Sequence, residues 1–341
     1  MRTLLLLWLF VAPSADTLQV MFWNVENFFD WRNDSTTVSD VEFSAAGERH
    51  WTWKRFQAKA NAFAKALFWA EAETGRLPDI IGLEEVENAF VLRQLLQKTA
   101  LRKLDYKYAH YDSPDRRGID VALLYRTSRL ELLDSKPCHL FAADTVMATR
   151  DILLCVFQRD SAKVAVLVNH HPSKYGGAAE SEPRRRIAVE RLRFLADSLT
   201  AIGIDWIIAG GDFNDTPDNP VFGLLEPALA PMHMDLFRHG LGTIKFDGKW
   251  DLIDHIYVSP ALLDAPMSAP ASDSSLGVTG RQEDTVGAPS ARARMRILRI
   301  PFLLTRDTVH SGEKPLRTYT GPRHTGGVSD HLPVLLEVHF Q

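Results

Sequence analysis

The stretch Trp-Ile-Ile-Ala-Gly-Gly-Asp-Phe-Asn, residues 206–214, carries the most information about the fold. A short apolar run ends in two glycines and is followed by a carboxylate, Asp212, and a carboxamide, Asn214. Because alternate side chains of a strand share one face, an extended chain would direct Asp212 and Asn214 into the same space. Glycines let the backbone bend or approach a neighbour closely. The segment suits a site where a phosphate lies beside a metal ion, and it also suits a polar turn after a core strand.

The same arrangement recurs along the chain, because other strand-like runs end or begin next to acids, amides and histidines. Strands that run one way contribute residues at their ends, and antiparallel neighbours contribute residues at their starts, so one rim of a sheet can collect them all. The other expected strands are 18–23, 79–83, 119–125, 164–168, 256–258 and 332–338. The polar residues expected at the rim are Asn24, Glu85, His170, Asp212, Asn214, Asp254, Asp330 and His331.

Seven short motifs contain these residues and follow one another from about residue 18 to residue 339. They are Trp23-Asn24-Val25-Glu26-Asn27, Leu83-Glu84-Glu85-Val86, the run from Arg117-Gly118-Ile119-Asp120 to Tyr125, Asn169-His170, Gly211-Asp212-Phe213-Asn214, Asp254-His255-Ile256 and Ser329-Asp330-His331. In this order they resemble the endonuclease/exonuclease/phosphatase superfamily, which includes pancreatic-type deoxyribonucleases, exonuclease III-like repair nucleases and sphingomyelinases. The stretches 242–245, 314–319 and 326–329 look similar to a secreted bacterial branch of it.

The alternation of apolar β-type runs with helical patterns predicts an α/β fold. Apolar residues recur at helical spacing over 53–73 and again over 183–200, where Pro183 is expected to open the helix. Both helices are expected to cover a sheet. The resemblance implies a more specific architecture, a four-layer sandwich of two mixed β-sheets packed back to back with helices outside.

The predicted chemistry is metal-assisted hydrolysis of a phosphoric ester. Carboxylate and amide oxygens in a chain with two cysteines favour Mg²⁺, with Mn²⁺ or Ca²⁺ as alternatives, over a zinc cage. By resemblance Glu85 is the principal metal ligand, with Glu26 or Asn24 and Asp330 nearby. Glu84 stands where many relatives have glutamine, and it is either unrelated to the site or a buried partner of a histidine.

The resemblance also implies roles for the other rim residues. His170 and His331 are expected to move protons, because histidine titrates near neutral pH. Asp254 is expected to orient His331, Asp212 to orient or deprotonate the attacking water, and Asn214 to bond a phosphoryl oxygen. Which group is the base and which the acid stays open. Substrate contacts are expected from Arg117, Asp120, Asn169 and Lys174.

The start of the chain and one internal segment lie outside this pattern. Residues 1–15, with Arg2 followed by the apolar run 4–11 and small residues at 12–15, are expected to be a signal peptide; the run is too short to span a bilayer. Residues 16–341 are then one catalytic domain of an exported protein. Residues 266–290 are rich in Ala, Ser, Pro, Gly and Asp, and we expect a mobile loop. Export permits a Cys138–Cys155 disulfide, and two buried free thiols are the alternative.

Charge bears on the choice of substrate. Without residues 1–15 the chain has 38 lysines and arginines against 43 acids, a net charge of about −5, whereas a general nucleic-acid binder carries a basic stripe. A local patch is still sufficient. We expect an exported phosphodiesterase that acts on nucleic acid. The alternatives are a sphingomyelinase-like lipid phosphodiesterase, a small-molecule phosphatase and, more remotely, a binding protein that kept the fold. The sequence gives no oligomeric state.

Overall fold

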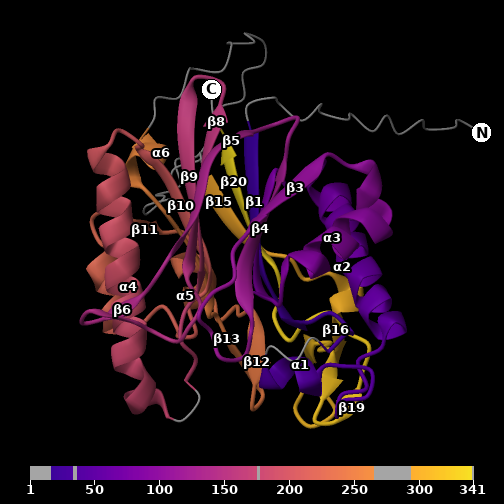
Figure 1. Ribbon diagram of the computed structural model, residues 1–341. Helices are drawn as coiled ribbons and strands as arrows, with labels where there is room; N and C mark the ends of the chain where they lie inside the picture. Colours follow the sequence, from indigo (N-terminus) through magenta and orange to yellow (C-terminus); the bar gives the residue numbers. More distant parts are fainter. Residues whose placement is uncertain (1–16, 34–36, 175–176, 265–292, 340–341) are drawn as a thin grey trace, which may run out of the picture.

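The fold is built on two six-stranded mixed sheets. The computed structural model describes residues 17–33, 37–174, 177–264 and 293–339 (Figure 1). The first sheet has the order β15 (Ala293–Ile297), β20 (Val334–His339), β1 (Thr17–Phe28), β2 (Ile80–Val86), β4 (Asp120–Arg126), β3 (Tyr106–His110). The second has the order β11 (Ala230–Pro231), β14 (Asp254–Val258), β10 (Trp206–Asp212), β9 (Ala162–His170), β8 (Ile152–Arg159), β5 (Glu131–Cys138). One pair in each sheet is parallel, β1 with β2 and β9 with β10, and the other pairs are antiparallel.

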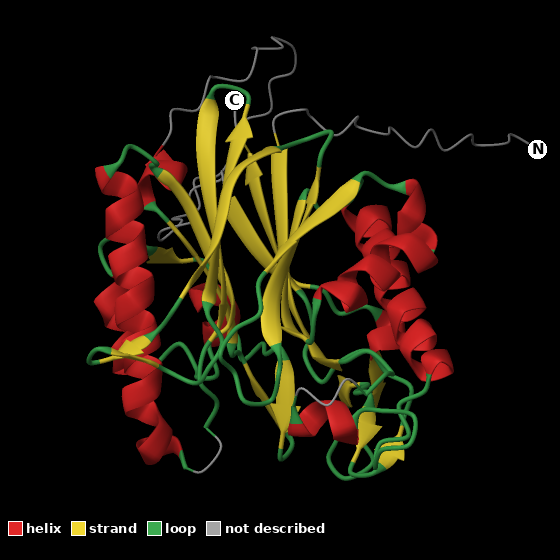
Figure 2. Ribbon diagram, in the orientation of Figure 1, coloured by secondary structure: helices red, strands yellow, loops and turns green. Residues whose placement is uncertain are grey.

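Helices lie outside both sheets, α2 (Trp53–Thr74) and α3 (Ala89–Lys98) on one side and α4 (Ala178–Ala201) on the other (Figure 2). Thr52 caps the start of α2, and Gly75 ends it with φ +80°. The shorter helices are α1 (Val38–Glu42), α5 (Met234–Arg238), α6 (Pro260–Asp264) and the 3₁₀ turns Ala100–Lys103, Pro220–Leu225 and Pro301–Leu303. The small hairpins are β6 (Phe141–Ala142) with β7 (Thr145–Val146), β12 (Ile244–Phe246) with β13 (Lys249–Asp251), β16 (Leu304–Arg306) with β17 (Glu313–Pro315), and β18 (Tyr319–Thr320) with β19 (Arg323–His324).

Three apolar cores separate the four layers. Strand alternation divides the residues of β1 between two of them: Val20 and Phe22 face the second sheet, whereas Met21 and Trp23 face α2, where Trp23 stacks on Phe63. A third core joins the second sheet to α4. Gly210 of β10 lies against the Phe22 ring, where a Cβ would come within 2.4 Å of it. The four-layer sandwich implied by the resemblance is therefore confirmed.

Most expected elements are present, with two corrections. Pro183 does not open its helix: α4 begins five residues earlier, at Ala178, and Pro183 lies in its second turn. The apolar segment 297–304 also predicts a strand, but in the structure β15 ends at Ile297 and β16 begins at Leu304, because Pro301 begins a 3₁₀ turn between them.

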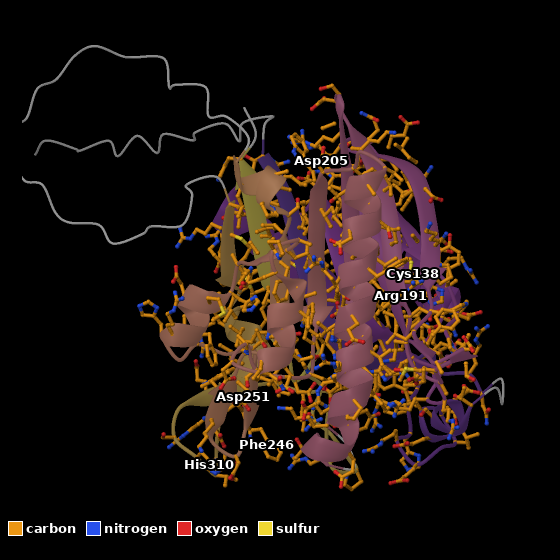
Figure 3. The ribbon with its side chains drawn as sticks, turned by 90° about the vertical axis from the view of Figure 1, so that its left-hand side faces the viewer. Cys138, Arg191, Asp205, Phe246, Asp251 and His310 are labelled. Carbon is orange, nitrogen blue, oxygen red and sulfur yellow. The ribbon has the colours of Figure 1, made fainter. Side chains whose placement is uncertain are left out.

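The two cysteines are free thiols on opposite faces of the second sheet. Cys138 lies in the core beside α4, near Arg191 (Figure 3), and Cys155 lies in the core between the sheets. Of the two alternatives, the free thiols are the ones observed. The expected signal peptide, residues 1–15, and the expected loop, residues 266–290, lie outside the described residues. None of the described helices is long and apolar enough to cross a membrane.

Candidate active site

Strand alternation carries polar side chains to one end of the core between the sheets. The buried row of β1 that faces this core, Leu18, Val20 and Phe22, continues into Asn24. This end of the sheets is the one beside β12 and β13 (Figure 1), since His331 forms a bridge with Ile244. The same alternation places Glu84 on β2, His170 on β9, Asp212 on β10 and Asp254 on β14 beyond the apolar rows of their strands.

Five of the predicted residues form one buried group, which we call the Asp212 cluster: Asn24, His170, Asp212, Asp254 and His331. The carboxylate of Asp212 accepts a hydrogen bond from Asn24 Nδ2 at 3.0 Å. Its Oδ2 atom lies 3.6 Å from His170 Nε2 and 3.9 Å from His331 Nε2. One carboxylate thus lies between two imidazoles, as the sequence predicts for a shared rim.

His331 and Asp254 form the predicted pair. Nδ1 of His331 lies 2.8 Å from Asp254 Oδ2, and the hydroxyl of Thr243 donates to the same oxygen. Trp23 Nε1 donates to the carbonyl of His331 at 3.0 Å, and the His331 amide donates to Ser329 Oγ at 2.9 Å. The ring is therefore held from both its main chain and its side chain, with Nε2 directed toward Asp212.

Burial and charge push the pKa values of the two histidines in opposite directions. Burial lowers the pKa of His170 well below 6.5, and the nearby Arg150 lowers it further. Burial acts the same way on His331, but the charges of Asp254 and Asp212 outweigh it and hold its pKa well above 6.5. Burial raises the pKa of Asp212 to about 7 against the lowering effect of His331. A neutral imidazole (His170), a carboxylate able to take a proton (Asp212) and an imidazolium (His331) therefore lie together. Neighbouring groups whose pKa values are pushed apart in this way are typical of acid–base sites.

Asn214 follows the cluster with φ +53°, a left-handed conformation that is uncommon outside glycine. Its amide donates to Asp212 Oδ1 at 2.8 Å, and its side-chain Nδ2 donates to the carbonyl of His171 at 2.9 Å. The turn therefore fixes both the Asp212 carboxylate and the Asn214 carboxamide. The predicted contact of Asn214 with a phosphoryl oxygen stays a prediction.

Three other predicted residues, Glu26, Glu85 and Asp330, form a second set, which we call the outer carboxylates. The ladders of β1 and β2 are interrupted after Asn24 and Glu84, and Glu26 and Glu85 have φ values of +45° and +63°. Such bulges redirect side chains and recur beside active sites. The Oδ1 atom of Asn24 accepts from the Glu26 amide at 3.0 Å, which joins the outer carboxylates to the Asp212 cluster.

Cations already lie against each outer carboxylate. Arg317 Nε lies 3.1 Å from Glu26 and its Nη2 lies 2.9 Å from Asp330, while Arg117 Nη2 lies 3.6 Å from Glu85. Burial, followed by the charge of Asp330, raises the pKa of Glu26 to about 7. A hard divalent cation takes carboxylate and amide oxygens as ligands, so Glu26, Glu85 and Asp330 fit Mg²⁺, with Asn24 beside them.

Glu84 lies fully buried beneath the Asp212 cluster. Neither of its carboxyl oxygens has a hydrogen-bond partner among the described residues. Burial raises its pKa well above 4.5, and the charges of Asp254 and Asp212 add to the effect. The raised pKa favours the neutral, protonated form of Glu84, in which it is close in character to a glutamine.

The predicted substrate-contacting residues lie in different surroundings. Asn169 is fully buried and donates to the carbonyls of Leu167 and Gly210, so it fastens β9 to β10. Lys174 Nζ lies 2.6 Å from Asp215 with its side chain 44% exposed, and Arg117 is 46% exposed. Both cations can therefore be reached from solvent.

Asp120 lies in a separate group with His110 and Asp112. It accepts from the Ser113 amide at 2.8 Å, and its Oδ2 lies 3.2 Å from His110 Nε2. Within the described part of the chain, His110, Asp112 and Asp120 are the three His, Cys, Asp or Glu residues whose ligand atoms lie within 4.8 Å of one another. The outer carboxylates are spaced more widely.

Three residues of the site, Thr243, Arg317 and Lys59, have no role predicted from the sequence. Thr243 and Arg317 lie in the two stretches, 242–245 and 314–319, that were noted only for their likeness to a bacterial branch. Lys59 lies on the buried face of α2, where its position in a helical pattern predicts only a polar surface. Arg185 forms an ion pair with Asp215 at 3.1 Å, behind Lys174.

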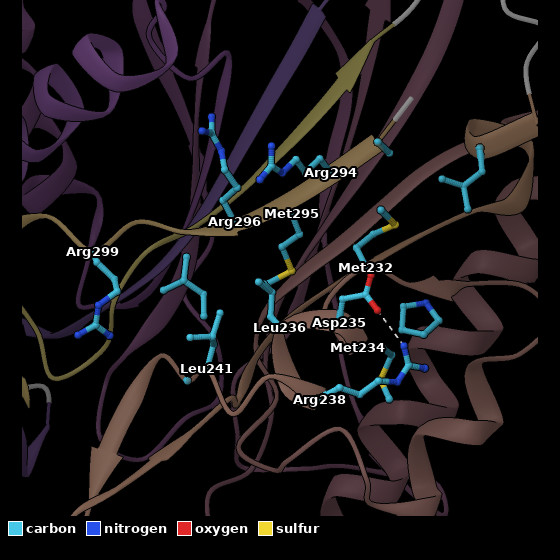
Figure 4. A pocket seen from close by; sticks show the side chains of 15 residues that line it. Met232, Met234, Asp235, Leu236, Arg238, Leu241, Arg294, Met295, Arg296 and Arg299 are labelled. Carbon is cyan, nitrogen blue, oxygen red and sulfur yellow. Dashed lines mark hydrogen bonds and ion pairs between the residues drawn. The ribbon is translucent and has the colours of Figure 1, made fainter. Parts of the chain in front are cut away.

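Two hollows lie near these elements. One of about 140 Å³ borders one outer carboxylate, Glu26, and is lined also by Asn27, Phe43, Arg49, Arg317, Thr318, Tyr319 and Gly321. The other, of about 840 Å³, lies between β15 and α5, away from the Asp212 cluster, and its lining includes Arg238, Met295 and Arg299 (Figure 4).

The two stacked mixed sheets and the rim of acids, amides and histidines define an α/β-sandwich phosphoesterase. The chain belongs to the Endonuclease/Exonuclease/phosphatase family, whose sequence pattern matches residues 19–339. As a member of that family it is a metal-dependent phosphoric ester hydrolase. The predicted superfamily is confirmed, and its secreted branch stays a prediction. No curated protein matches the chain.

Solved structures share the fold at low sequence identity. The human Nocturnin catalytic domain with bound sulfate is similar over 96% of this chain and 95% of its own, with 17% identity and a TM-score of 0.55. A mannosyl-6-phosphatase of Bacteroides thetaiotaomicron is similar over 95% and 100%, with 16% identity and a TM-score of 0.55. D. rerio TDP2 complexed with a single-strand DNA product is similar over 94% and 98%, with 15% identity and a TM-score of 0.50.

Proposed function

We propose that the protein is an exported phosphodiesterase that hydrolyses nucleic-acid phosphodiester bonds by metal-assisted attack of water. The observation that carries the proposal is the placement of Asp212 between a neutral His170 and a protonated His331, next to the outer carboxylates. Phosphodiesters resist attack because their oxygens repel nucleophiles and the alkoxide is a poor leaving group. The site offers carboxylates that fit a cation, which would offset the repulsion, and a protonated His331, which can give a proton to the leaving group.

Residues of both groups, the outer carboxylates and the Asp212 cluster, have roles in this proposal. Glu26, Glu85 and Asp330, with Asn24 beside them, would hold Mg²⁺, which when bound would supply charge stabilisation and a more acidic water. Asp212, whose pKa is about 7, takes a proton from the attacking water. His331, kept protonated by Asp254, donates a proton to the leaving oxygen, and Asn214 bonds a phosphoryl oxygen.

Nucleic acid is the proposed substrate because solvent-accessible cations flank the site. Arg117 and Lys174 are each nearly half exposed and lie on the loops that follow or precede rim strands. A nucleic-acid backbone presents further phosphates on either side of the scissile one, and cations of this kind hold it in register. The likeness to a TDP2 structure that contains a single-strand DNA product supports the same choice.

A small-molecule phosphatase is the second candidate. The chain is acidic overall, and the hollow beside Glu26, at about 140 Å³, suits one small group better than a polymer. The likeness to a mannosyl-6-phosphatase supports this candidate. The two functions differ in whether the phosphate carries one ester bond or two.

The test is a panel assay with purified protein. Duplex DNA, RNA, sugar phosphates, sphingomyelin and a chromogenic phosphodiester are each incubated with Mg²⁺, Mn²⁺ or Ca²⁺. We expect hydrolysis of nucleic acid with Mg²⁺, loss with EDTA and recovery on adding the metal back. Asp212→Ala and His331→Ala should each abolish hydrolysis without changing the circular dichroism spectrum. Release of inorganic phosphate from sugar phosphates alone would favour the second candidate, and activity in a folded double variant would exclude the mechanism.

Export is tested separately. Expression of the full-length chain in a Gram-negative host, followed by N-terminal sequencing of the periplasmic fraction, should give a protein that starts near residue 16. A protein that stays in the cytoplasm with its first fifteen residues intact would contradict export while leaving the enzymatic proposal untouched.

A further inference from the structure

Arg317 occupies the space between two of the outer carboxylates. Its guanidinium spans Glu26 at 3.1 Å and Asp330 at 2.9 Å, and its side chain is 49% exposed. The two carboxylate side chains are less exposed, with exposed fractions of 5% for Glu26 and 24% for Asp330. A half-exposed cation is therefore bound to two carboxylates that are less exposed than it is.

The fixed positions of these ligands follow from their main-chain contacts. Glu26 Oε2 accepts from the Thr318 amide at 2.7 Å, and Asp330 lies between Ser329 and His331, whose contacts hold the segment against β1. A buried carboxylate such as Glu26, with the partly exposed Asp330 near it, is stabilised by a positive charge that contacts both. The guanidinium supplies that charge in the resting protein.

We propose that Arg317 is the resting counter-ion of the metal site: it competes with the divalent cation for Glu26 and Asp330, and cation binding frees its guanidinium for a phosphoryl oxygen of the substrate. The inference rests on the metal-dependent function proposed above and deepens it. It makes metal binding and substrate binding two steps of one exchange, in which a single arginine moves from protein carboxylates to a phosphate.

Arg317 is suited to this exchange, and the buried Lys59 is not. Lys59 is fully buried, with Nζ bonded to the Glu26 carbonyl and to Thr318 Oγ1 at 2.9 Å, so it stays in place as a fixed charge. Arg317 instead borders the 140 Å³ hollow beside Glu26, into which its guanidinium can turn. The planar guanidinium of arginine donates two parallel hydrogen bonds to a carboxylate, and it can do the same with a phosphate.

The experiment measures metal affinity without turnover. Free Mn²⁺ is followed by electron paramagnetic resonance during titration of metal-free protein at pH 8, for the wild type, Arg317→Met, Arg317→Lys and the control Arg238→Met. Arg238 forms an exposed ion pair with Asp235 at 2.8 Å, so its replacement removes the same charge elsewhere. We expect Arg317→Met to bind Mn²⁺ about 5- to 10-fold more tightly than the wild type, and the control to match the wild type.

The lysine variant and substrate kinetics complete the test. Lysine keeps the charge but cannot span both carboxylates, so Arg317→Lys should show an intermediate Mn²⁺ affinity. At saturating metal Arg317→Met should raise KM for substrate at least about 10-fold, with a smaller change in kcat, because a ground-state phosphate contact is lost. A wild type that binds no Mn²⁺ would refute the proposed function itself. A wild type that binds Mn²⁺ with the same affinity as a folded Arg317→Met variant would overturn the exchange alone.

Discussion

At the scale of single residues, the site is organised by charge states that burial creates. Asp212 lies between His170, whose pKa is lowered, and His331, whose pKa is raised, although both imidazoles are buried. The difference comes from Asp254, which bonds His331 at 2.8 Å and has no counterpart on His170, since His170 Nδ1 lacks a hydrogen-bond partner in the described part of the chain. One neighbouring carboxylate thus decides which histidine can act as an acid.

This asymmetry gives a prediction for Asp254→Asn. A general acid works while it is protonated, so the alkaline limb of the kcat/KM profile should follow the pKa of His331, well above 6.5. Removing the charge of Asp254 lowers that pKa, and the alkaline limb should move to lower pH together with a drop of about 10²- to 10⁴-fold in kcat/KM. The measurement is a kcat/KM profile from pH 5 to 10. The exposed replacement Asp235→Asn is the control, and an unmoved alkaline limb in Asp254→Asn would show that His331 is not the titrating acid.

Glu84 gives a second prediction at this scale, because a buried neutral acid becomes costly once it ionises. Its folded pKa is raised above the unfolded value near 4.5, so its stabilising contribution is complete below pH 4.5 and is lost as pH rises toward the folded pKa. Glu84→Gln stays neutral. Relative to the wild type its free energy of unfolding should increase by up to about 1.4 kcal/mol per pH unit above 4.5. Urea unfolding of both proteins at pH 5, 6.5 and 8 in EDTA checks this. A difference independent of pH would mean that Glu84 is ionised throughout.

At the scale of elements, β10 places the site because its two glycines admit close neighbours. Gly211 has φ +127°, and a Cβ there would lie 2.1 Å from the carbonyl oxygen of Asn169 and 2.8 Å from Glu84 Oε1. The strand therefore brings Asp212 against β9 and above Glu84 at a distance that no other residue type permits. The close approach of the Asn169 carbonyl and of Glu84 therefore requires glycine at position 211, in line with the close approach expected of these glycines.

We predict that Gly211→Ala is destabilising and nearly inactive. The clash with main chain cannot be relieved by rotating a side chain, and the positive φ adds strain, so the loss should be about 2–4 kcal/mol in the free energy of unfolding. Gly223→Ala is the matched control, since a Cβ at Gly223 has no atom within 4 Å. Urea denaturation and hydrolysis assays of both variants measure the effect. Equal stability of the two variants would contradict the close packing at Gly211.

The same elements show what the sequence could and could not reveal. Asn24, His170, Asp212, Asp254 and His331 were predictable because each stands at the end or start of an apolar strand, and strand ends meet at a rim. The outer carboxylates were predicted from resemblance, and the bulges that turn them appear only in the structure. Arg317 and Thr243 approach the site from loops, where no periodicity relates position in the chain to position in space. Lys59 looks like an ordinary polar position of α2 until its burial is known.

At the scale of the whole molecule, an acidic protein is proposed to act on an acidic polymer. With a net charge of about −5 outside residues 1–15, long-range attraction does not bring nucleic acid to the site, and binding must depend on a few local cations. Arg117 and Lys174 are the exposed candidates, and each is already paired with a carboxylate, Glu85 and Asp215 respectively. Binding should therefore be weak and should release few counter-ions.

This balance predicts a shallow salt dependence. With about three phosphate contacts, from Arg117, Lys174 and the Arg317 released by the metal, a plot of log(kcat/KM) for single-stranded DNA against log[salt] should have a slope of about −2.1, and Arg117→Met should reduce its magnitude by about 0.7. Arg238→Met, which removes an exposed charge at α5, should leave the slope unchanged. The assay is run from 50 to 300 mM salt, a range chosen on the order of physiological ionic strength, at fixed saturating Mg²⁺. A slope steeper than about −5 would mean that an extended basic surface engages the polymer, and a slope of zero with intact Arg117 would favour a small phosphate ester as substrate.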